Sequence, residues 1–239
     1  MSVALFRGEK SMQLIQHRFC PHSRFVRVVL GEYGVPTELL DEPVWERREA
    51  FLALNPAGTT PVLIDDGLTV PGAMVIAEYL DETFGPDHSS GRLLPVDREG
   101  RVEVRRIAHW FHDKCFSEVT EYLVHEKIFK RHLPVADGGG SPDSSAIRAA
   151  RSNIRYHLDY IGWLLKERNW LAGDRLSYAD IAAAAHLSTA DYLGDVPWHE
   201  NESAKNWYAR MKSRPSFRPL LSESLPGMTP SPGYANLDF

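Results

Sequence analysis

The sequence predicts an α/β domain followed by an all-α domain, and three observations support this fold class. Up to residue 84, short apolar segments typical of strands alternate with segments whose apolar residues recur at helical spacing. From residue 98 onward the spacing of apolar residues is helical throughout. Between these parts, residues 85–97 are rich in Gly, Pro, Ser and His, which is typical of a linker. We therefore expect one domain at residues 12–84 and a second at residues 98–214.

The expected elements of the first domain follow the order βαβ and then ββα. Gly34 ends the first helix, and Asp66-Gly67 is a turn that joins two short strands into a hairpin. This order is that of the thioredoxin fold, which we therefore predict for this domain. The expected strands span residues 12–16, 37–40, 62–64 and 68–70, and the expected helices span residues 23–33, 44–54 and 73–84.

The second domain is expected to be a bundle of helices. One helix start is marked by a capping box, because Ser177 can cap the helix while Asp180 reaches back to the backbone N–H of the cap. The motif is structural and carries no catalytic information. The other expected segments are helices at residues 99–131, 147–168 and 200–213, and a mobile Gly-rich loop at residues 134–145.

Both ends of the chain are expected to lie outside these domains. We expect residues 1–11 to form a disordered leader. Their apolar run is too short for a signal peptide. Residues 215–239 contain five prolines before residue 233, so we expect an extended tail without a helix. The end of the tail has a composition suited to binding in a partner's groove, although packing against the chain's own surface is an equal alternative. The candidate contact residues are Tyr234, Leu237, Asp238 and Phe239.

The composition excludes several classes of function. The 239 residues carry 27 basic and 32 acidic side chains, so a net charge of −5 gives no reason to expect binding to nucleic acid. No apolar run approaches the roughly 20 residues that span a bilayer, so we expect no membrane insertion. The two cysteines form no spacing pattern, which favours a reducing cytoplasm. We expect no metal site: His109 and His112 lie three residues apart on one helix with Asp113 and Cys115 nearby, but helical His pairs without a converging third ligand are usually packed or solvated.

Two local motifs predict a site at the edge of the first domain. Thr60-Pro61 directly precedes a short apolar strand, which predicts a cis peptide bond and a backbone that can pair with an extended peptide. Cys20 lies just before the first helix, where a helix N-terminus stabilises a thiolate. Position 23 is Ser23 rather than a second cysteine, so Cys20 would need an external thiol to resolve a disulfide. Ser23 is itself a second candidate nucleophile, and the alternative is a turn retained only for its geometry.

These motifs, together with the stretch at residues 170–181, resemble the glutathione transferase superfamily over nearly all of residues 12–217. In that superfamily the helix after the hairpin opens with an acidic residue and a serine, which hold the γ-glutamyl carboxylate of glutathione at the helix N-terminus. The matching positions here are Gly72 and Ala73. The resemblance therefore implies a vestigial glutathione site at Thr60, Pro61, Gly72 and Ala73, and no cofactor. The alternative is a glutathione-dependent transferase or thiol transferase that uses Cys20 or Ser23.

Within the superfamily, four segments resemble the transferase-like cell division regulators of alphaproteobacteria: residues 19–27, 44–48 and 70–73, and the Pro-rich tail. The resemblance implies a non-catalytic homodimer that binds FtsZ filaments in the cytoplasm at the division site and signals through its C-terminus to septal wall synthesis. Trp45 and Arg48 are the candidate filament contacts, because an exposed Trp beside Arg is typical of binding hot spots. A place for Trp45 in the core or a dimer face is equally compatible with the sequence.

Overall fold

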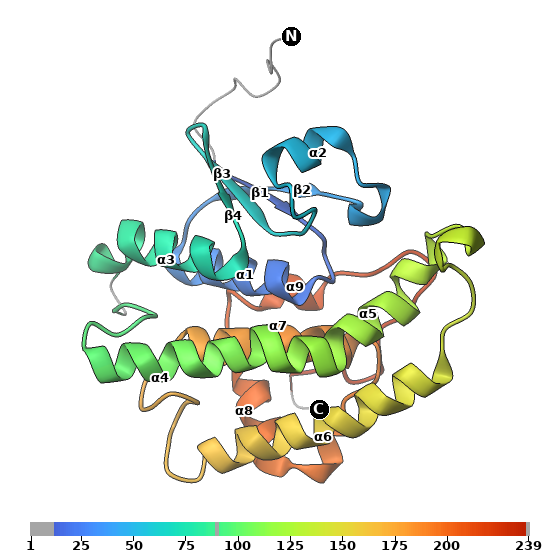
Figure 1. The fold of residues 1–239 in the computed structure, drawn as a ribbon. Coiled ribbons are helices and arrows are strands. Elements are labelled where there is room, and N and C mark those ends of the chain that lie inside the picture. The colour runs from blue at the N-terminus through green and yellow to red at the C-terminus, as the bar shows by residue number, and fades with distance from the viewer. Residues whose placement is uncertain (1–11, 89–90, 238–239) are drawn as a thin grey trace.

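The computed structural model describes residues 12–88 and 91–237. The expected leader and the tail residues Asp238 and Phe239 lie outside the described residues. An α/β domain sits above a helical domain, and α1 (Pro21–Tyr33) and α3 (Ala73–Phe84) lie between the sheet and the helical domain (Figure 1). The predicted fold class is confirmed.

The sheet of the first domain has four strands in the order β2-β1-β3-β4. β1 (Met12–Gln16) pairs in parallel with β2 (Thr37–Asp41), whereas β3 (Val62–Asp65) is antiparallel to β1 and to β4 (Leu68–Pro71). Leu14 is the centre of the register, opposite Leu39 on β2 and Leu63 on β3. Leu14 and Leu63 are fully buried, so the central strands anchor the sheet to α1 and α3.

The expected helix at residues 44–54 is wrong as a single element. It is divided into the short 3-10 helix η1 (Val44–Glu46) and α2 (Glu49–Leu54). Arg47 between them has a φ of 47°, a left-handed conformation that ends the first turn. Phe51 of α2 packs with Ile15 and Val62 on the face of the sheet that α1 and α3 leave open.

The helical domain is built around α7 (Tyr178–Tyr192), all fifteen residues of which are buried. The predicted capping box is present, with both the Ser177 and the Asp180 side-chain bonds formed. α7 packs against α1, and Tyr178 of α7 donates a hydrogen bond to the carbonyl of Ala77 in α3 at 2.8 Å. The two domains therefore share one apolar core.

A long helical segment crosses the domain beside α7, in three parts. α4 (Arg98–His109) continues through the π-helix η3 (Trp110–Thr120) into α5 (Glu121–Lys127), so the helix expected to reach residue 131 ends four residues earlier. No described helix is long and apolar enough to cross a membrane. The remaining helices are α6 (Ser144–Leu164), α8 (Glu202–Lys212) and α9 (Arg218–Leu221), with short 3-10 turns η2 (Gly85–Asp87), η4 (Phe129–Arg131), η5 (Val135–Asp137) and η6 (Trp198–Glu200).

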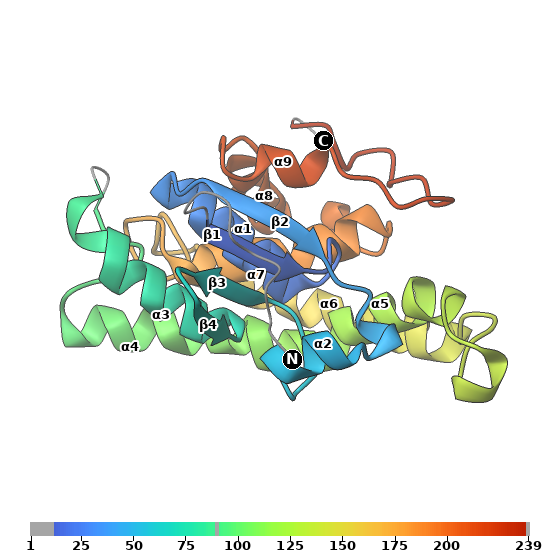
Figure 2. The same ribbon diagram turned by 90° about the horizontal axis from the view of Figure 1, so that it is seen from above.

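The described part of the C-terminal tail is folded against the body, so the expectation of an extended, helix-free tail is wrong. Pro219 lies in the first turn of α9, where its missing N–H is not needed. The tail then returns along the ends of α7 and α8: Ser231 N donates to Tyr192 O at 3.0 Å, and Lys212 Nζ donates to Gly233 O at 2.9 Å. Figure 2 shows α9 and the tail on the side of the molecule opposite α4.

Candidate functional site

A cleft of about 1010 Å³ separates the two domains at the N-terminal ends of α1 and α3. The α/β domain contributes Cys20, Thr60, Gly72 and Ala73, so the structure brings most of the predicted site residues together. The helical domain faces them with aromatic and ionisable side chains from η3, α5 and η4. They include Phe116, Glu121, His125 and Phe129.

The peptide bond between Thr60 and Pro61 is cis, as predicted. Cys20 Sγ lies 3.5 Å from the carbonyl oxygen of Thr60, which places the thiol beside the backbone that would pair with an extended peptide. The frame of a glutathione site is therefore intact at this edge of the domain.

The start of α3 lacks the side chains that would hold a carboxylate. Gly72 is the N-cap residue and makes no side-chain capping bond, and Ala73 is the first helical residue. The φ of Gly72 is 92°, a conformation that glycine adopts without strain and other residues rarely adopt. An acidic residue at this position would therefore have to adopt a backbone conformation that residues other than glycine rarely adopt.

Cys20 is the residue of this site whose electrostatics are most unusual. Burial raises the pKa of its thiol, but the side-chain hydrogen bond and positive charge of His22, with added bonds from Ser23, outweigh burial and bring the pKa to about 7. A substantial fraction of the thiol is then ionised at neutral pH. Ser23 itself is fully buried, and its Oγ accepts a bond from His17 N at 3.4 Å, which does not suit the expected role as a nucleophile.

The two candidate filament contacts differ in their surroundings. Trp45 is half-buried at the cleft, where its ring stacks on His132 with centroids 4.4 Å apart and meets Phe129 at 5.6 Å. The ring therefore joins the two domains, and its role as a filament contact stays a prediction. Arg48 is 53% exposed and forms an ion pair with the buried carboxylate of Glu42, so it remains on the surface.

The candidate contacts in the tail are also separated by the structure. Tyr234 is 0% exposed: its hydroxyl donates to Leu220 O at 2.8 Å and accepts from Arg24 Nη1 at 3.0 Å. The hypothesis that Tyr234 reaches a partner away from the body is therefore wrong. Leu237 is partly buried against the same core. The open alternative, that the tail packs on the chain's own surface, is confirmed for the described residues.

Sequence reasoning missed one cluster beside the cleft. It weighed His112 together with His109, but the His109 side chain is 76% exposed. The structure instead brings His112 to His22 and His186, which lie on α1 and α7. No local signal could have found this group, because its members are far apart in the sequence and meet only through packing of the two domains.

The thioredoxin-like domain, the all-α domain and the cleft between them define a protein of the glutathione transferase type. The chain belongs to the glutathione S-transferase family: the N-terminal domain of that family matches residues 14–88, and its C-terminal domain matches residues 119–215.

Three comparisons place the chain within the family. It is 44% identical to FtsZ-localized protein A of Caulobacter vibrioides over 92% of this chain and 94% of that protein. It superimposes on the crystal structure of a glutathione S-transferase from Sinorhizobium meliloti with a TM-score of 0.93 and 52% identity, covering 96% of this chain and all of that one. The structure of FzlA from C. crescentus gives a TM-score of 0.88 and 42% identity, with 96% and 100% covered.

Proposed function

We propose that this protein is a non-catalytic regulator of bacterial cell division that binds FtsZ filaments and links them to septal cell-wall synthesis. The observation that carries the proposal is the likeness to FtsZ-localized protein A along nearly the whole of both chains. The site supports the non-catalytic part of the proposal. Gly72 and Ala73 at the start of α3 provide no side chain that could hold the carboxylate of glutathione. On this proposal the protein acts in the cytoplasm at the division site and requires no cofactor.

The proposal predicts weak binding of glutathione or none. A charge-assisted hydrogen bond contributes about 1.5–3 kcal/mol, so the loss of two weakens binding by roughly 10²–10⁴-fold. Isothermal titration calorimetry with reduced glutathione measures this directly. Ala73→Ser is the matched variant, because it restores the hydroxyl without straining Gly72, and it should strengthen binding by about tenfold. A micromolar dissociation constant for the wild-type protein would contradict the proposal.

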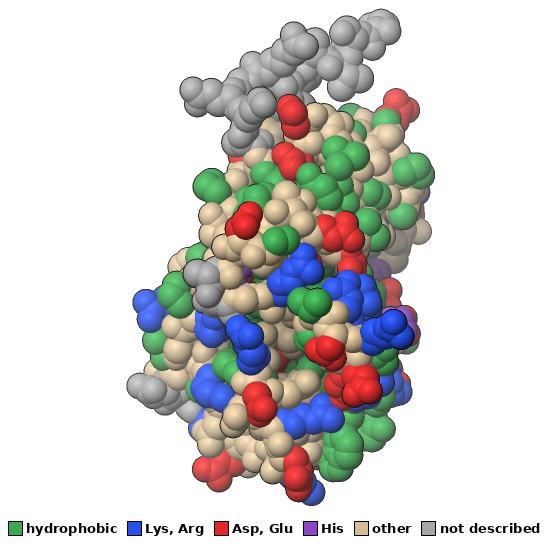
Figure 3. All heavy atoms as spheres, turned by 90° about the vertical axis from the view of Figure 1, so that its left-hand side faces the viewer, with side chains coloured by type: hydrophobic (Ala, Val, Ile, Leu, Met, Phe, Trp, Pro, Cys, Tyr) green, Lys and Arg blue, Asp and Glu red, His purple; other side chains and the backbone are tan. Residues whose placement is uncertain are grey.

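We also propose that the protein works as a homodimer that pairs through the face formed by α3 and α4. Glu78 of α3 binds Arg105 of α4 at 2.8 Å, which fixes the two helices against each other. One turn before each of these residues, Val75 and Val102 are 59% and 65% exposed. On the face shown in Figure 3, hydrophobic side chains gather over the α/β domain, while acidic and basic side chains intermix over the helical domain. A dimer would also hold two filament sites together, so that a modest single contact suffices.

A thiol transferase that uses Cys20 is the second candidate function, and one observation favours it. The pKa of the Cys20 thiol is about 7 and the residue lines the cleft beside the cis Thr60-Pro61 bond. Reduction of a mixed disulfide between glutathione and a small thiol is the matching assay. Robust turnover that Cys20→Ser abolishes and Ser23→Ala leaves intact would favour the enzyme over the regulator.

A further inference from the structure

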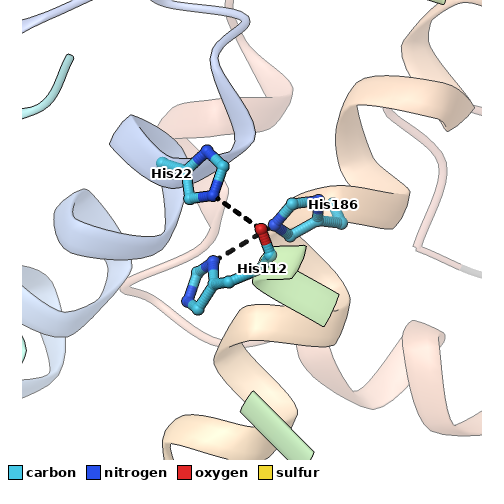
Figure 4. Close-up of side chains that lie close together, drawn as sticks. All are labelled: His22, His112 and His186. Atoms are coloured by element: carbon cyan, nitrogen blue, oxygen red, sulfur yellow. Dashed lines mark hydrogen bonds between the residues drawn. The ribbon is translucent and has the colours of Figure 1, made fainter. Parts of the chain in front are cut away.

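Three imidazole rings from three elements meet where the two domains join. His22 comes from the first turn of α1, His112 from the π-helix η3, and His186 from the middle of α7 (Figure 4). One ring nitrogen from each residue lies within 4.8 Å of the others. His112 and His186 are buried, whereas His22 lines the cleft. The group is therefore enclosed on its inner side and reachable from solvent on its outer side.

One separation in the group already matches that of a metal site. Zinc binds histidine nitrogens at about 2.0–2.1 Å in a tetrahedron, which places the nitrogens about 3.4 Å apart. His112 Nδ1 and His186 Nε2 are already 3.2 Å apart. His22 Nε2 is held nearby by a bond to the carbonyl of His112 at 3.1 Å, so a change in its ring orientation brings a third nitrogen into the group.

Hydrogen bonds from neighbouring residues orient metal-binding histidines in known metal sites, and a similar bond is present here. His186 Nδ1 bonds to the hydroxyl of Thr120 at 3.0 Å, which aims Nε2 into the cluster. His112 Nε2 is buried and has no hydrogen-bond partner among the described residues. That nitrogen is therefore free to take the ring hydrogen of His112 when Nδ1 binds a metal. The hydrogen bonds among the described residues therefore leave one buried ring nitrogen of the cluster without a partner.

The protonation state also suits a cation. Burial lowers the pKa of His112 and of His186 well below the usual value, so both rings are neutral and each has a lone pair. Neutral imidazole is the form that binds zinc and similar metals. Moreover, His112 lies in a π-helix, a geometry frequent at functional sites.

We propose that His22, His112 and His186 form a three-histidine site for a divalent transition metal of the zinc type, with a fourth position open toward the cleft. Three histidine nitrogens with one open position are a known donor set for zinc, and binding would release the proton of His22. Because His22 belongs to the α/β domain and the other two ligands to the helical domain, the metal also joins the domains. This proposal does not rest on filament binding, so its test can fail while the proposed function stands.

The test is a titration of Co²⁺ into the chelator-treated full-length chain, prepared without a histidine tag. One Co²⁺ per chain should give the intense visible absorption of tetrahedral nitrogen coordination, and Zn²⁺ should abolish the band by displacement. Bound Zn²⁺ should also raise the midpoint of thermal unfolding, because the metal binds only the folded chain. Absence of the band at stoichiometric Co²⁺, or an unchanged unfolding midpoint with Zn²⁺, would overturn the proposal.

Variants assign the ligands. His22→Gln, at the cleft, should fold normally and lose the band, as should His186→Gln if circular dichroism confirms its fold. His109→Gln and His125→Gln are the matched controls, since His109 is exposed and His125 lies elsewhere on the cleft wall, and both should keep the band. Cys20→Ser should keep it too, because the cluster is formed by nitrogen donors alone. A band that survives His22→Gln and His186→Gln places the metal elsewhere and refutes this site.

Discussion

His157 is a fully buried imidazole whose protonation is set by its neighbours. Burial lowers its pKa to about 4, against the opposing effect of Glu118 and in the same direction as nearby Lys114. Its Nδ1 accepts a hydrogen bond from Trp110 Nε1 at 3.0 Å, which a protonated ring cannot do. Neutral His157 therefore contributes stability that is complete above pH 6.5, its unfolded pKa, and that is lost as the pH falls through about 4.

This pKa shift gives a prediction for stability against pH. His157→Gln retains an acceptor for Trp110 but does not titrate. Between pH 6.5 and about 4, the variant should lose less unfolding free energy than the wild-type protein, by up to about 3 kcal/mol. Urea unfolding at several pH values across this window measures the difference. Parallel curves for the two proteins would show that His157 is not the titrating group.

Trp45 shows why residue types predict a contact better than they predict its partner. An aromatic ring among charges indicates a contact surface, and the ring does make contacts. The partner is His132 of the same chain, 87 residues away, which no local pattern could reveal. Cys20, Thr60 and Gly72 could be placed correctly because each depends on the turn or helix start beside it.

Among the elements, those with local determinants were predicted well. The helix at residues 73–84 and the strand at residues 12–16 have the expected bounds, and the capping box at Ser177 lies within three residues of its partner. The break in the expected helix at residues 44–54 was not predicted, because nothing in the residue type of Arg47 indicates its left-handed conformation. The tail was misjudged because its anchors, Arg24 and Tyr192, are distant in the sequence.

The anchored tail is expected to contribute to the stability of the fold. Tyr234→Ala removes a buried ring that packs on Tyr192 with centroids 5.1 Å apart, and it leaves Arg24 without one of its bonds. The unfolding free energy should fall by about 3–5 kcal/mol. Deleting residues 238–239 should leave it unchanged, because the described anchors of the tail precede residue 238. Urea unfolding of the two variants separates these cases, and a Tyr234→Ala variant as stable as the wild-type protein would contradict the anchored tail.

On the scale of the whole molecule, the α3–α4 face predicts the state of assembly. Val75→Arg places a charge on the proposed dimer face and should convert the protein to monomers, since buried unpaired charge is strongly unfavourable. Tyr122→Arg is the matched control, because Tyr122 is an exposed residue on α5, away from that face. Sedimentation velocity gives the mass of each. Dimers of Val75→Arg, or monomers of the wild-type protein, would contradict the proposed face.

Co-sedimentation tests whether the protein associates with FtsZ filaments. The purified protein should pellet with FtsZ assembled in GTP and remain in the supernatant with FtsZ in GDP. Arg48→Ala should reduce pelleting, and circular dichroism should confirm that the variant is folded, because the substitution leaves the buried carboxylate of Glu42 without its ion-pair partner. Wild-type protein that stays in the supernatant at every concentration of GTP-assembled FtsZ would rule out filament binding.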